Sequence, residues 1–392
     1  MTRKTIAEMV AALRPRYLAG SKQQKQAILD EFCLTTGHHR KSATRLLNRE
    51  PATAGPKTGR PKTYGPQVAS ALAKLWEAAD RSCSKRLAPF LPDLLAVLER
   101  QGELTLTDDL KAQLLSLSPA TIDRLLAPLR PKGLRRPFIP SQASARLRAL
   151  VPLRTFAEWQ GVAPGALQAD LVSHCGQSTA GFYLTTLVGV DVATGWVEAE
   201  PLWGKSQERV RGGFHRQRMR LPFGVRSLHT DNGAEFINRV LYPYCVKHVI
   251  RLSRGRPYKK NDQAYVEQKN WFVVRKFVGY DRFASKAALQ ALSELYEPLR
   301  LYMNFFQPLR KIVSKERVGA KVRKRYDTAR TPYQRLLASG VLDEQSAQRL
   351  RCQYLGLNPI KLRAEIDAAL ERLWQLAERE TAPQLRRSVA CG

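Results

Sequence analysis

Three acidic residues stand in sequence surroundings that suit a divalent-metal site. Asp170 interrupts a short apolar run, Asp231 lies in segment 228–236 (LHTDNGAEF), and Glu267 lies in segment 265–270 (YVEQKN). An interval of 35 residues separates Asp231 from Glu267. Carboxylates are the hard oxygen ligands that Mg²⁺ prefers. Two such ions, held about 3.5–4 Å apart, lower the barrier to phosphodiester cleavage by activating the nucleophile and stabilising the leaving oxygen.

Each acid also has an ordinary explanation when it is taken alone. Asp231 begins an Asp-Asn-Gly sequence, which is favourable turn chemistry. Glu267 by itself would be a solvated carboxylate on a helix. Asp191, which follows a buried apolar run, is an alternative to Asp170 as the first acid. It is the combination of the two later motifs at this separation that favours a catalytic site.

The chain from about residue 160 onward alternates between strand and helix patterns. We expect Asp170 on the first strand, Asp231 at the end of the fourth, and Glu267 on a helix after the loop 255–262. Asn270 would share a helical face with Glu267, where it could orient that acid or contact DNA. The expected strands are 169–172, 182–191, 196–199, 225–229 and 249–252, and the expected helices are 205–219 and 233–245.

Over about residues 160–305 these motifs resemble the catalytic core of bacterial insertion-sequence DDE transposases and retroviral integrases. The resemblance implies a ribonuclease-H-like core with a mixed five-stranded sheet. It also implies metal-dependent cleavage at mobile-element ends and transfer of the 3′-hydroxyl strand to target DNA. Asp170, Asp231 and Glu267 would then be the catalytic residues and the ligands of two Mg²⁺ or Mn²⁺ ions. Two or more copies of the chain would assemble on paired DNA ends.

The resemblance also favours one candidate for the first acid. In this superfamily the first ligand lies within the first strand, and an acid commonly recurs at the end of the second. Asp170 matches the ligand, and Asp191 would brace the turn to the third strand. The chain departs from the family in lacking an arginine after the glutamate, so Lys269 would supply the missing cation. The loop before the glutamate would contact phosphates through two lysines, Lys259 and Lys260.

The chain of 392 residues is basic along its whole length, with a net charge of +31 and a pI near 10.3. Residues 1–150, 151–300 and 301–392 carry net charges of +14, +8 and +9. A polyanionic partner explains this distribution, because each neutralised phosphate releases condensed counterions. The alternative is charge that serves only solubility. We expect DNA as the partner, both as element ends and as target, and no small-molecule substrate.

Several protein classes are excluded by the sequence. No apolar stretch of about 18 residues occurs, so no membrane span is expected, and the N-terminus lacks the apolar core of a signal peptide. The six cysteines include no Cys-x-x-Cys pair, and the adjacent His38 and His39 do not have zinc-finger spacing. We therefore expect a cytoplasmic, nucleoid-associated protein with reduced thiols and no structural zinc.

Residues 21–49 have the pattern of two short helices around a turn. Gly37 lies between them and can adopt a positive φ. A helix-turn-helix presents its second helix to the major groove in this way, although a helical hairpin with a solvated basic face has the same pattern. The second helix would expose His38, Arg40, Lys41, Ser42 and Arg45, of which Arg40, Lys41 and Arg45 are the candidate DNA contacts.

A second pair of DNA-binding segments follows. The stretch 51–62 is rich in Pro, Gly and cations, and predicts either a basic tether or an arm that enters an A·T-rich minor groove. Within 66–127, Ser118 would cap a helix that begins at Pro119, as the second helix of another helix-turn-helix module. The candidate DNA contacts in these two segments are Arg60, Lys62, Thr121 and Arg124.

The C-terminal region opens with the densest cationic run of the chain, in which alternating apolar residues suit short strands. Asn358 and Pro359 then begin a helix whose apolar stripe suits packing within the chain more than a partner surface. The sequence therefore predicts a multidomain α/β protein. Its parts are a helix-turn-helix domain (1–50), a basic linker (51–65), a second helix-turn-helix-like domain (66–127), a basic linker (128–159), an integrase-type core (160–306) and a basic region ending in amphipathic helices (307–392).

Two other functions fit parts of the sequence. A ribonuclease-H-like nuclease would cut RNA–DNA hybrids or branched DNA, but such an enzyme needs no end-specific modules. A helix-turn-helix regulator with an inert core would bind DNA without cutting it, but such a protein needs no intact set of acids.

Overall fold

The computed structural model describes residues 2–49, 64–129, 151–154, 156–159, 161–256, 260–318 and 321–378. The chain divides into two compact units, Met1–Thr63 and Tyr64–Gly392. The expected linkers fall largely outside the described residues, as do the candidate DNA contacts Arg60, Lys62 and Lys259. No helix in these described segments is long and apolar enough to cross a membrane.

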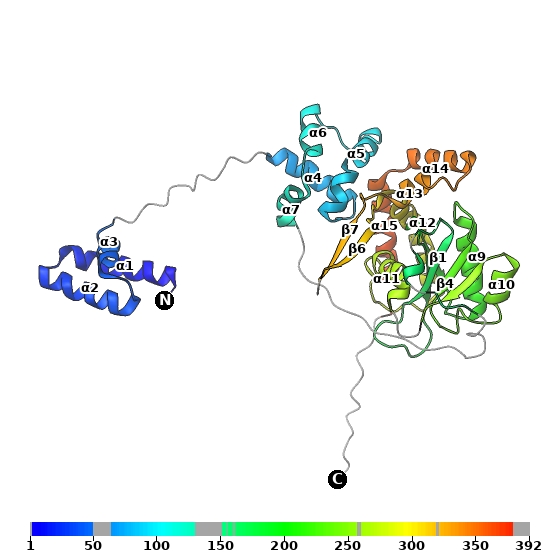
Figure 1. Cartoon of the computed structure of the whole chain (residues 1–392), viewed down its shortest axis with the longest axis horizontal. Coiled ribbons are helices and arrows are strands. Elements are labelled where there is room, and N and C mark those ends of the chain that lie inside the picture. Colours follow the sequence, from blue (N-terminus) through cyan, green and yellow to red (C-terminus); the bar gives the residue numbers. More distant parts are fainter. Residues whose placement is uncertain are drawn as a thin grey trace, which may run out of the picture. The chain divides into compact units, whose positions relative to one another are not determined.

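Three helices form the first unit: α1 (Arg3–Ala19), α2 (Lys22–Thr36) and α3 (Arg40–Asn48) (Figure 1). The sequence analysis predicts α2 and α3 but not α1, which contains Pro15 in its interior, where proline is unfavourable. The apolar residues of α1 nevertheless have helical spacing: Ile6, Met9, Val10, Leu13 and Tyr17. All three helices contribute to one small core, which contains Leu13, Tyr17, Ile28, Leu29, Phe32, Ala43 and Leu47.

The turn between α2 and α3 has the predicted geometry. Gly37 ends α2 with a φ of 70°, which confirms the expected left-handed conformation. Arg40, Lys41, Ser42 and Arg45 are exposed on α3 as expected, and Arg40 forms an ion pair with Asp30 of α2. The expectation for His38 is wrong: its ring is half-buried in the turn, with its centroid 5.9 Å from that of Phe32.

The second unit contains the predicted mixed five-stranded sheet, whose strand order is β3-β2-β1-β4-β5 (Figure 1). Strands β1 and β2 pair antiparallel, as do β2 and β3, whereas β1 pairs parallel with β4 and β4 parallel with β5. Every residue of β2 and β3 is buried, so both faces of this half of the sheet are covered. The strands are β1 (Ala166–Ser173), β2 (Thr185–Asp191), β3 (Val197–Leu202), β4 (Ser227–Thr230) and β5 (Arg251–Arg254).

Four helices of the core accompany the sheet: α9 (Gln207–Arg220), α10 (Leu241–Lys247), α11 (Ala264–Lys269) and α12 (Lys286–Phe306). The helix expected over 233–245 begins only at Leu241, which corrects the prediction. Asn238 explains the delay, because its amide donates to the carbonyls of Ala234 and Glu235 and its oxygen accepts from the N–H groups of Val240 and Leu241. A side chain that bonds the backbone in this way competes with helix formation.

The predicted second helical block consists of α4 (Pro66–Ala78), α5 (Ser84–Arg100), α6 (Asp108–Leu115) and α7 (Pro119–Leu126). The Ser118 hydroxyl caps α7 as expected. Arg124 is exposed, whereas Thr121 is half-buried and its hydroxyl accepts a hydrogen bond from Arg124 at 3.2 Å.

The helical block packs onto the sheet-containing core and the C-terminal helices through one continuous apolar cluster. The Tyr302 hydroxyl of α12 donates to the carbonyl of Ala78 at 2.7 Å. Asp80 forms ion pairs with Lys276 and with Arg363, the latter at 2.8 Å. Three parts of the chain that are distant in sequence therefore meet at the end of α4.

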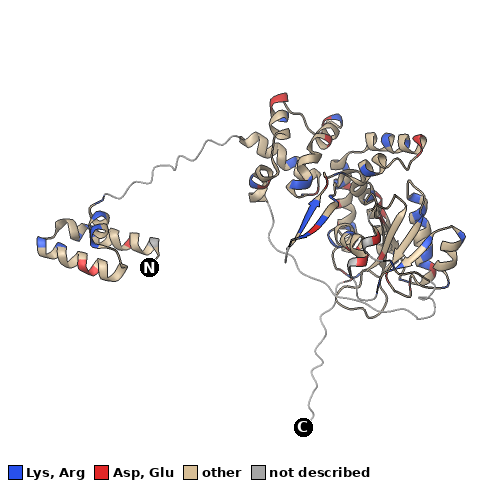
Figure 2. Ribbon diagram, viewed as in Figure 1, with Lys and Arg blue, Asp and Glu red and all other residues tan. Residues whose placement is uncertain are grey.

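The C-terminal region forms a hairpin of β6 (Ile312–Val318) and β7 (Lys321–Tyr326), followed by α13 (Pro332–Ala338), α14 (Glu344–Gly356) and α15 (Pro359–Gln375). Figure 2 colours part of this hairpin as lysine and arginine, and the sequence places Lys315 and Arg317 on β6 and Arg323, Lys324 and Arg325 on β7. Helix α15 packs on α12, and its expected stripe is buried except for Leu376, which lies just beyond the helix and is 36% exposed. The buried members are Leu362, Ile366, Ala369, Leu370 and Leu373.

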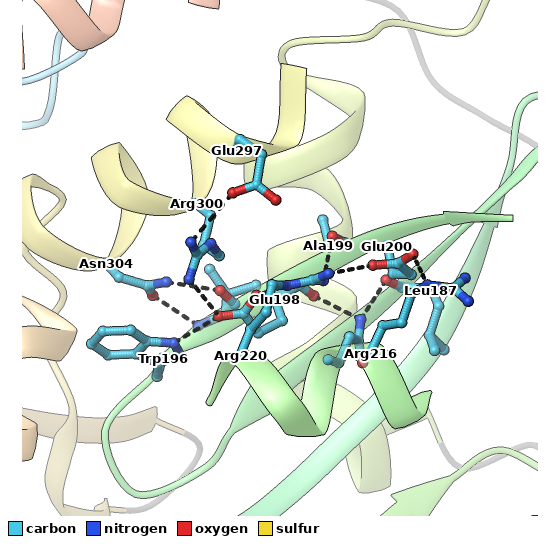
Figure 3. Close-up of polar contacts among 12 residues, drawn as sticks. Leu187, Trp196, Glu198, Ala199, Glu200, Arg216, Arg220, Glu297, Arg300 and Asn304 are labelled. Carbon is cyan, nitrogen blue, oxygen red and sulfur yellow. Dashed lines mark hydrogen bonds and ion pairs between the residues drawn. The ribbon is translucent and has the colours of Figure 1, made fainter. Parts of the chain in front are cut away.

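A buried polar cluster fixes the edge strand β3 between α9 and α12 (Figure 3). Glu198 accepts from Arg220 of α9 at 3.1 Å and from the Trp196 indole at 3.0 Å. Burial raises the pKa of Glu198, and the charges of Arg300 and Arg220 oppose that rise. Asn304 of α12 bonds both the N–H and the carbonyl of Val197, each at 2.8 Å. The edge strand is thus covered by a helix instead of being left open to another chain.

His174, directly after β1, is fully buried in a second polar contact. Its Nε2 lies 2.7 Å from the Thr186 hydroxyl, which lies 2.8 Å from the Tyr296 hydroxyl. Burial lowers the pKa of His174 to about 3. Histidine in an unfolded chain has a pKa of about 6.5. At mildly acidic pH the unfolded chain therefore binds a proton at His174, whereas the folded chain does not.

Acid should therefore destabilise the second unit through His174. We expect the free energy of unfolding to fall by roughly 2 kcal/mol between about pH 7 and pH 5 because of this residue. His174→Gln should lack this part of the loss in urea titrations, whereas His39→Gln in the first unit should keep it. Parallel pH profiles for the wild type and His174→Gln would refute the assignment.

Candidate active site

Asp170 lies on β1, the central strand of the sheet, between β2 and β4. The side chain is half-buried. One carboxylate oxygen accepts from the Asn270 amide at 2.7 Å, and the other accepts from the backbone N–H of Leu171 at 2.8 Å. A residue 100 positions further along the chain thus orients this acid.

Asp231 directly follows the last residue of β4. The parallel register places Gln168 of β1 level with His229 of β4, and Asp170 and Asp231 each lie two residues beyond this pair. Neighbouring strands are about 4.8 Å apart. Asp170 within β1 and Asp231 just after β4 are therefore each two residues beyond the last paired position of these adjacent strands.

The turn after β4 adds another carboxylate beside Asp231. The N–H of Gly233 donates to Asp231 at 2.8 Å. A β-carbon at Gly233 would lie 2.9 Å from that same carboxylate oxygen and 2.6 Å from the carboxyl carbon of Glu235. Only glycine fits between these groups without displacing one of them. Glu235 is not among the predicted site residues, although it is an acid only four positions after Asp231.

Glu267 is exposed on α11, which continues beyond Lys269 as a π-helical segment, Asn270–Arg275. Asn270 is the first residue of this segment and still follows Glu267 by three residues, and its amide contacts Asp170. Local π-helix often marks functional sites. The negative charge of Glu267 raises the pKa of Asp170, so the two acids lie within electrostatic reach.

The two aspartates of the site have raised pKa values, because they are partly buried and other carboxylates lie close to them. Burial and then the charge of Asp231 raise the pKa of Asp170 to about 7, although its hydrogen bonds oppose the shift. Burial also raises the pKa of Asp231 to about 6, with a contribution from Glu235. Groups that are destabilised in their charged forms are typical of functional sites, although structural networks show the same behaviour.

In the part of the chain that the structure describes, no three His, Cys, Asp or Glu side chains are grouped closely enough to hold a metal ion. The donor set still has suitable chemistry, because carboxylate oxygens are hard ligands and a cation would favour the charged forms of both aspartates. The Asn270 amide oxygen is buried without a hydrogen-bond partner beside these acids. Metal binding by Asp170, Asp231 and Glu267 stays a prediction.

Gln168 connects the strand of the first acid to the helix of the third. Its fully buried amide donates to the carbonyl of Asp262 at 3.1 Å, and its oxygen accepts from the N–H of Val266 at 3.3 Å. Asp262 is held in turn by the Arg256 guanidinium at 2.9 Å. In the sequence, Gln168 stands out only as a lone amide in an apolar strand, and its role depends on contacts that form on folding.

Asp191 has the bracing role expected of it. Its carboxylate is fully buried and accepts from the N–H of Gly165 at 2.9 Å and from the N–H and hydroxyl of Thr194 at 2.8 and 2.7 Å. It pairs with Leu167, three residues before Asp170 on β1. Asp170 is the better candidate ligand, because the charges of Asp231 and Glu267 act on Asp170, whereas Asp191 pairs three residues earlier along β1.

The candidate DNA contacts lie in different parts of the molecule. Lys269 is half-buried on α11, and burial followed by the charge of Arg86 lowers its pKa to about 8. Lys260 begins the short helix η3 (Lys260–Gln263). Thr121 and Arg124 lie on α7, whereas Arg40, Lys41 and Arg45 belong to the other compact unit.

The integrase core domain matches residues 163–260 of the chain. The matched segment includes Asp170 and Asp231 and ends before Glu267. A relative from Sinorhizobium fredii (strain NBRC 101917 / NGR234), "Uncharacterized protein y4rM", is 42% identical over 324 residues, which cover 82% of this chain and 92% of the relative.

Solved retroviral structures are similar to parts of the chain at lower identity. The HTLV-2 integrase catalytic core domain with magnesium is 17% identical, with a TM-score of 0.30, over 38% of this chain and 93% of that chain. The catalytic core domain of BIV integrase is 19% identical, with a TM-score of 0.27, over 45% of this chain and 95% of that chain. Because these scores are low, the assignment depends on the domain match, the sheet and the bacterial relative. The chain belongs to the same family as the y4rM protein and contains an integrase/transposase-type core with a ribonuclease-H-like fold.

Proposed function

We propose that this chain is a DNA transposase that cleaves at the ends of a mobile element and transfers the 3′-hydroxyl strand to target DNA. One observation carries the proposal: Asp170 within β1 and Asp231 just after the adjacent parallel strand β4 lie two residues beyond the same strand pair, and the charges of Asp231 and Glu267 both act on Asp170. An integrase core domain is a polynucleotidyl-transferase core, and the match covers the first two of these acids.

Asp170, Asp231 and Glu267 would hold two Mg²⁺ or Mn²⁺ ions. When bound, such ions activate the attacking hydroxyl and stabilise the leaving oxygen of the phosphodiester. The Asn270 amide and the N–H of Gly233 orient the two aspartates. Gln168 keeps α11, and with it Glu267, against the strand of Asp170.

DNA recognition would come from the helical parts and the basic surface of the chain. The exposed cations of α3 would contact the element ends, and the exposed Arg124 of α7 would add a second contact. Phosphate contacts supply affinity and register, whereas base contacts supply sequence preference. Two or more copies would assemble on paired ends.

The reaction products distinguish a transposase from a nuclease and from a DNA-binding regulator. Duplexes that carry the inverted repeats flanking the gene should be nicked, and the released 3′ ends should be joined to a second duplex. Nicking of any hybrid or branched substrate without joining would favour a nuclease. Binding without nicking at any Mg²⁺ or Mn²⁺ concentration would favour a regulator.

Asp231→Asn should abolish nicking of the end duplex while leaving DNA binding intact. The amide keeps the size of the side chain but removes a charged metal ligand, which we expect to cost about 100-fold or more in rate. Gel assays of nicking and filter binding of the same duplex measure the two effects. Asp281→Asn, at an exposed position outside the three acidic motifs, is the matched control. A normally active Asp231→Asn protein would overturn the site assignment.

Asn270→Ala should raise the Mg²⁺ concentration needed for half-maximal nicking by about tenfold or more, because the Asp170 carboxylate loses the group that orients it. The measurement is a metal titration of the nicking rate at saturating DNA. A merely structural role would instead lower the melting temperature and leave the metal requirement unchanged. Unaltered metal dependence in a well-folded variant would exclude this positioning role.

Lys41→Ala combined with Arg45→Ala should weaken binding of end duplexes. Each lost phosphate contact should reduce the slope of log Kd against log salt by about one. Lys22→Ala, at an exposed position in the first turn of α2, is the control and should keep the wild-type slope. If the double variant and the control have the same Kd at every salt concentration, α3 does not contact the end duplex.

A further inference from the structure

A groove of about 1960 Å³ runs along α11 within the second unit. Tyr265, Gln268, Lys269 and Phe272 line it, whereas Glu267 and Asn270 do not. Residues three and four apart share one face of a helix. Helix α11 therefore has two functional faces. One carries Glu267 and Asn270 at the candidate active site, and the opposite face lines the groove.

Three parts of the chain form the walls of the groove. The second helical block contributes the start of α5 with Lys85 and Arg86, the core contributes α11, and the β6–β7 hairpin contributes Lys315 and Lys324. Both strands of that hairpin carry basic residues. The groove thus depends on the packing of the helical block against the core.

The groove has a large excess of positive charge. Eleven lysines and arginines but only four acids occur among the described residues that line it. All four acids are already engaged. Asp80 pairs with Lys276 and Arg363, Asp367 also pairs with Arg363, Glu77 pairs with Arg81, and Asp123 accepts a hydrogen bond from the Ser84 hydroxyl.

Like charges also face one another in this groove. Lys315 stands directly opposite Lys324 across the hairpin, a pairing that destabilises a sheet by itself. Arg86 and Lys269 are close enough to repel each other. Such pairs are expected where a polyanion supplies the missing negative charge.

An exposed aromatic ring adjoins these cations. Trp271 is 43% exposed and lines the groove at the start of the π-helical segment. Its ring centroid lies 5.0 Å from that of Phe272, and the Arg86 guanidinium lies 5.3 Å from the Phe272 centroid. Proteins bind unpaired nucleotides with a groove lined by lysine and arginine that also exposes an aromatic ring. The cations contact the phosphates, and the bases stack on the ring.

We propose that this groove binds a single, unpaired DNA strand, with a base stacked on Trp271 and phosphates on Arg86, Lys269 and the hairpin lysines. The proposal rests on the proposed function in so far as cleavage near an element end leaves a strand to be held. A duplex fits the lining less well, since its bases stack on one another and offer no free face to Trp271.

The test measures binding of the full-length chain to a fluorescein-labelled oligothymidine of about 20 nucleotides and to a duplex of equal length by fluorescence anisotropy. Trp271→Ala should weaken oligothymidine binding roughly tenfold and leave duplex binding unchanged, and Trp271→Phe should restore most of the loss. Lys315→Gln with Lys324→Gln, at exposed positions, should reduce the salt slope for oligothymidine by roughly one. Lys286→Gln, outside the groove, should match the wild type in both assays.

Unchanged oligothymidine binding in both the Trp271→Ala and the double-lysine variants would overturn the proposal. A selective loss of duplex binding in these variants would also overturn it, because the occupant would then be a duplex. These outcomes differ from failure of the proposed function. If the chain never nicks or joins DNA, the transposase assignment is wrong, even if Trp271→Ala weakens single-strand binding. If the chain is an active transposase but the groove variants bind oligothymidine normally, only the groove proposal is wrong.

Discussion

The parallel pairing of β1 with β4 is the constraint on which the candidate site depends. It places Asp170 and Asp231, which are 61 positions apart in sequence, each two residues beyond the last paired position of two adjacent strands. Burial and mutual repulsion then raise the pKa of Asp170, so the fold holds charged groups where their charged forms are disfavoured. A cation between them would offset this repulsion and favour the charged forms.

The third acid depends on a different kind of connection. Glu267 is on a short helix after a loop, and loops fix position poorly unless their backbone is bonded to the scaffold. Gln168 supplies that bond from inside the sheet, and Arg256 and Asp262 hold the start of the same helix. The amide of Asn270 closes the link back to Asp170. One face of this helix therefore belongs to the acids, while the other face lines the basic groove.

The second helical block is part of the same compact unit as the core. Asp80, which has a positive φ of 50°, forms ion pairs with Lys276 and Arg363, about 200 and 280 residues away in sequence. The Tyr302 hydroxyl donates a hydrogen bond to the last residue of α4. Buried carboxylates are retained where they are paired in this way. Because the block and the core share one apolar cluster, a groove between them has walls that are held in place. The first unit, in contrast, closes its own small core.

The sequence by itself determined the local chemistry: the turn at Gly37, the caps at Ser118 and Asn358, and the order of strands and helices in the core. It also supplied the three acids as candidates for the site. These features depend on neighbouring residues, so a linear reading reaches them. Tertiary structure decided what depends on partners distant in sequence. Asn270 bonds Asp170, Glu235 joins the site through a turn where a helix was expected, and Gln168 ties strand to helix. Hydrogen bonds across about 100 residues leave no spacing pattern in the chain, because only the folded sheet brings their donors and acceptors together.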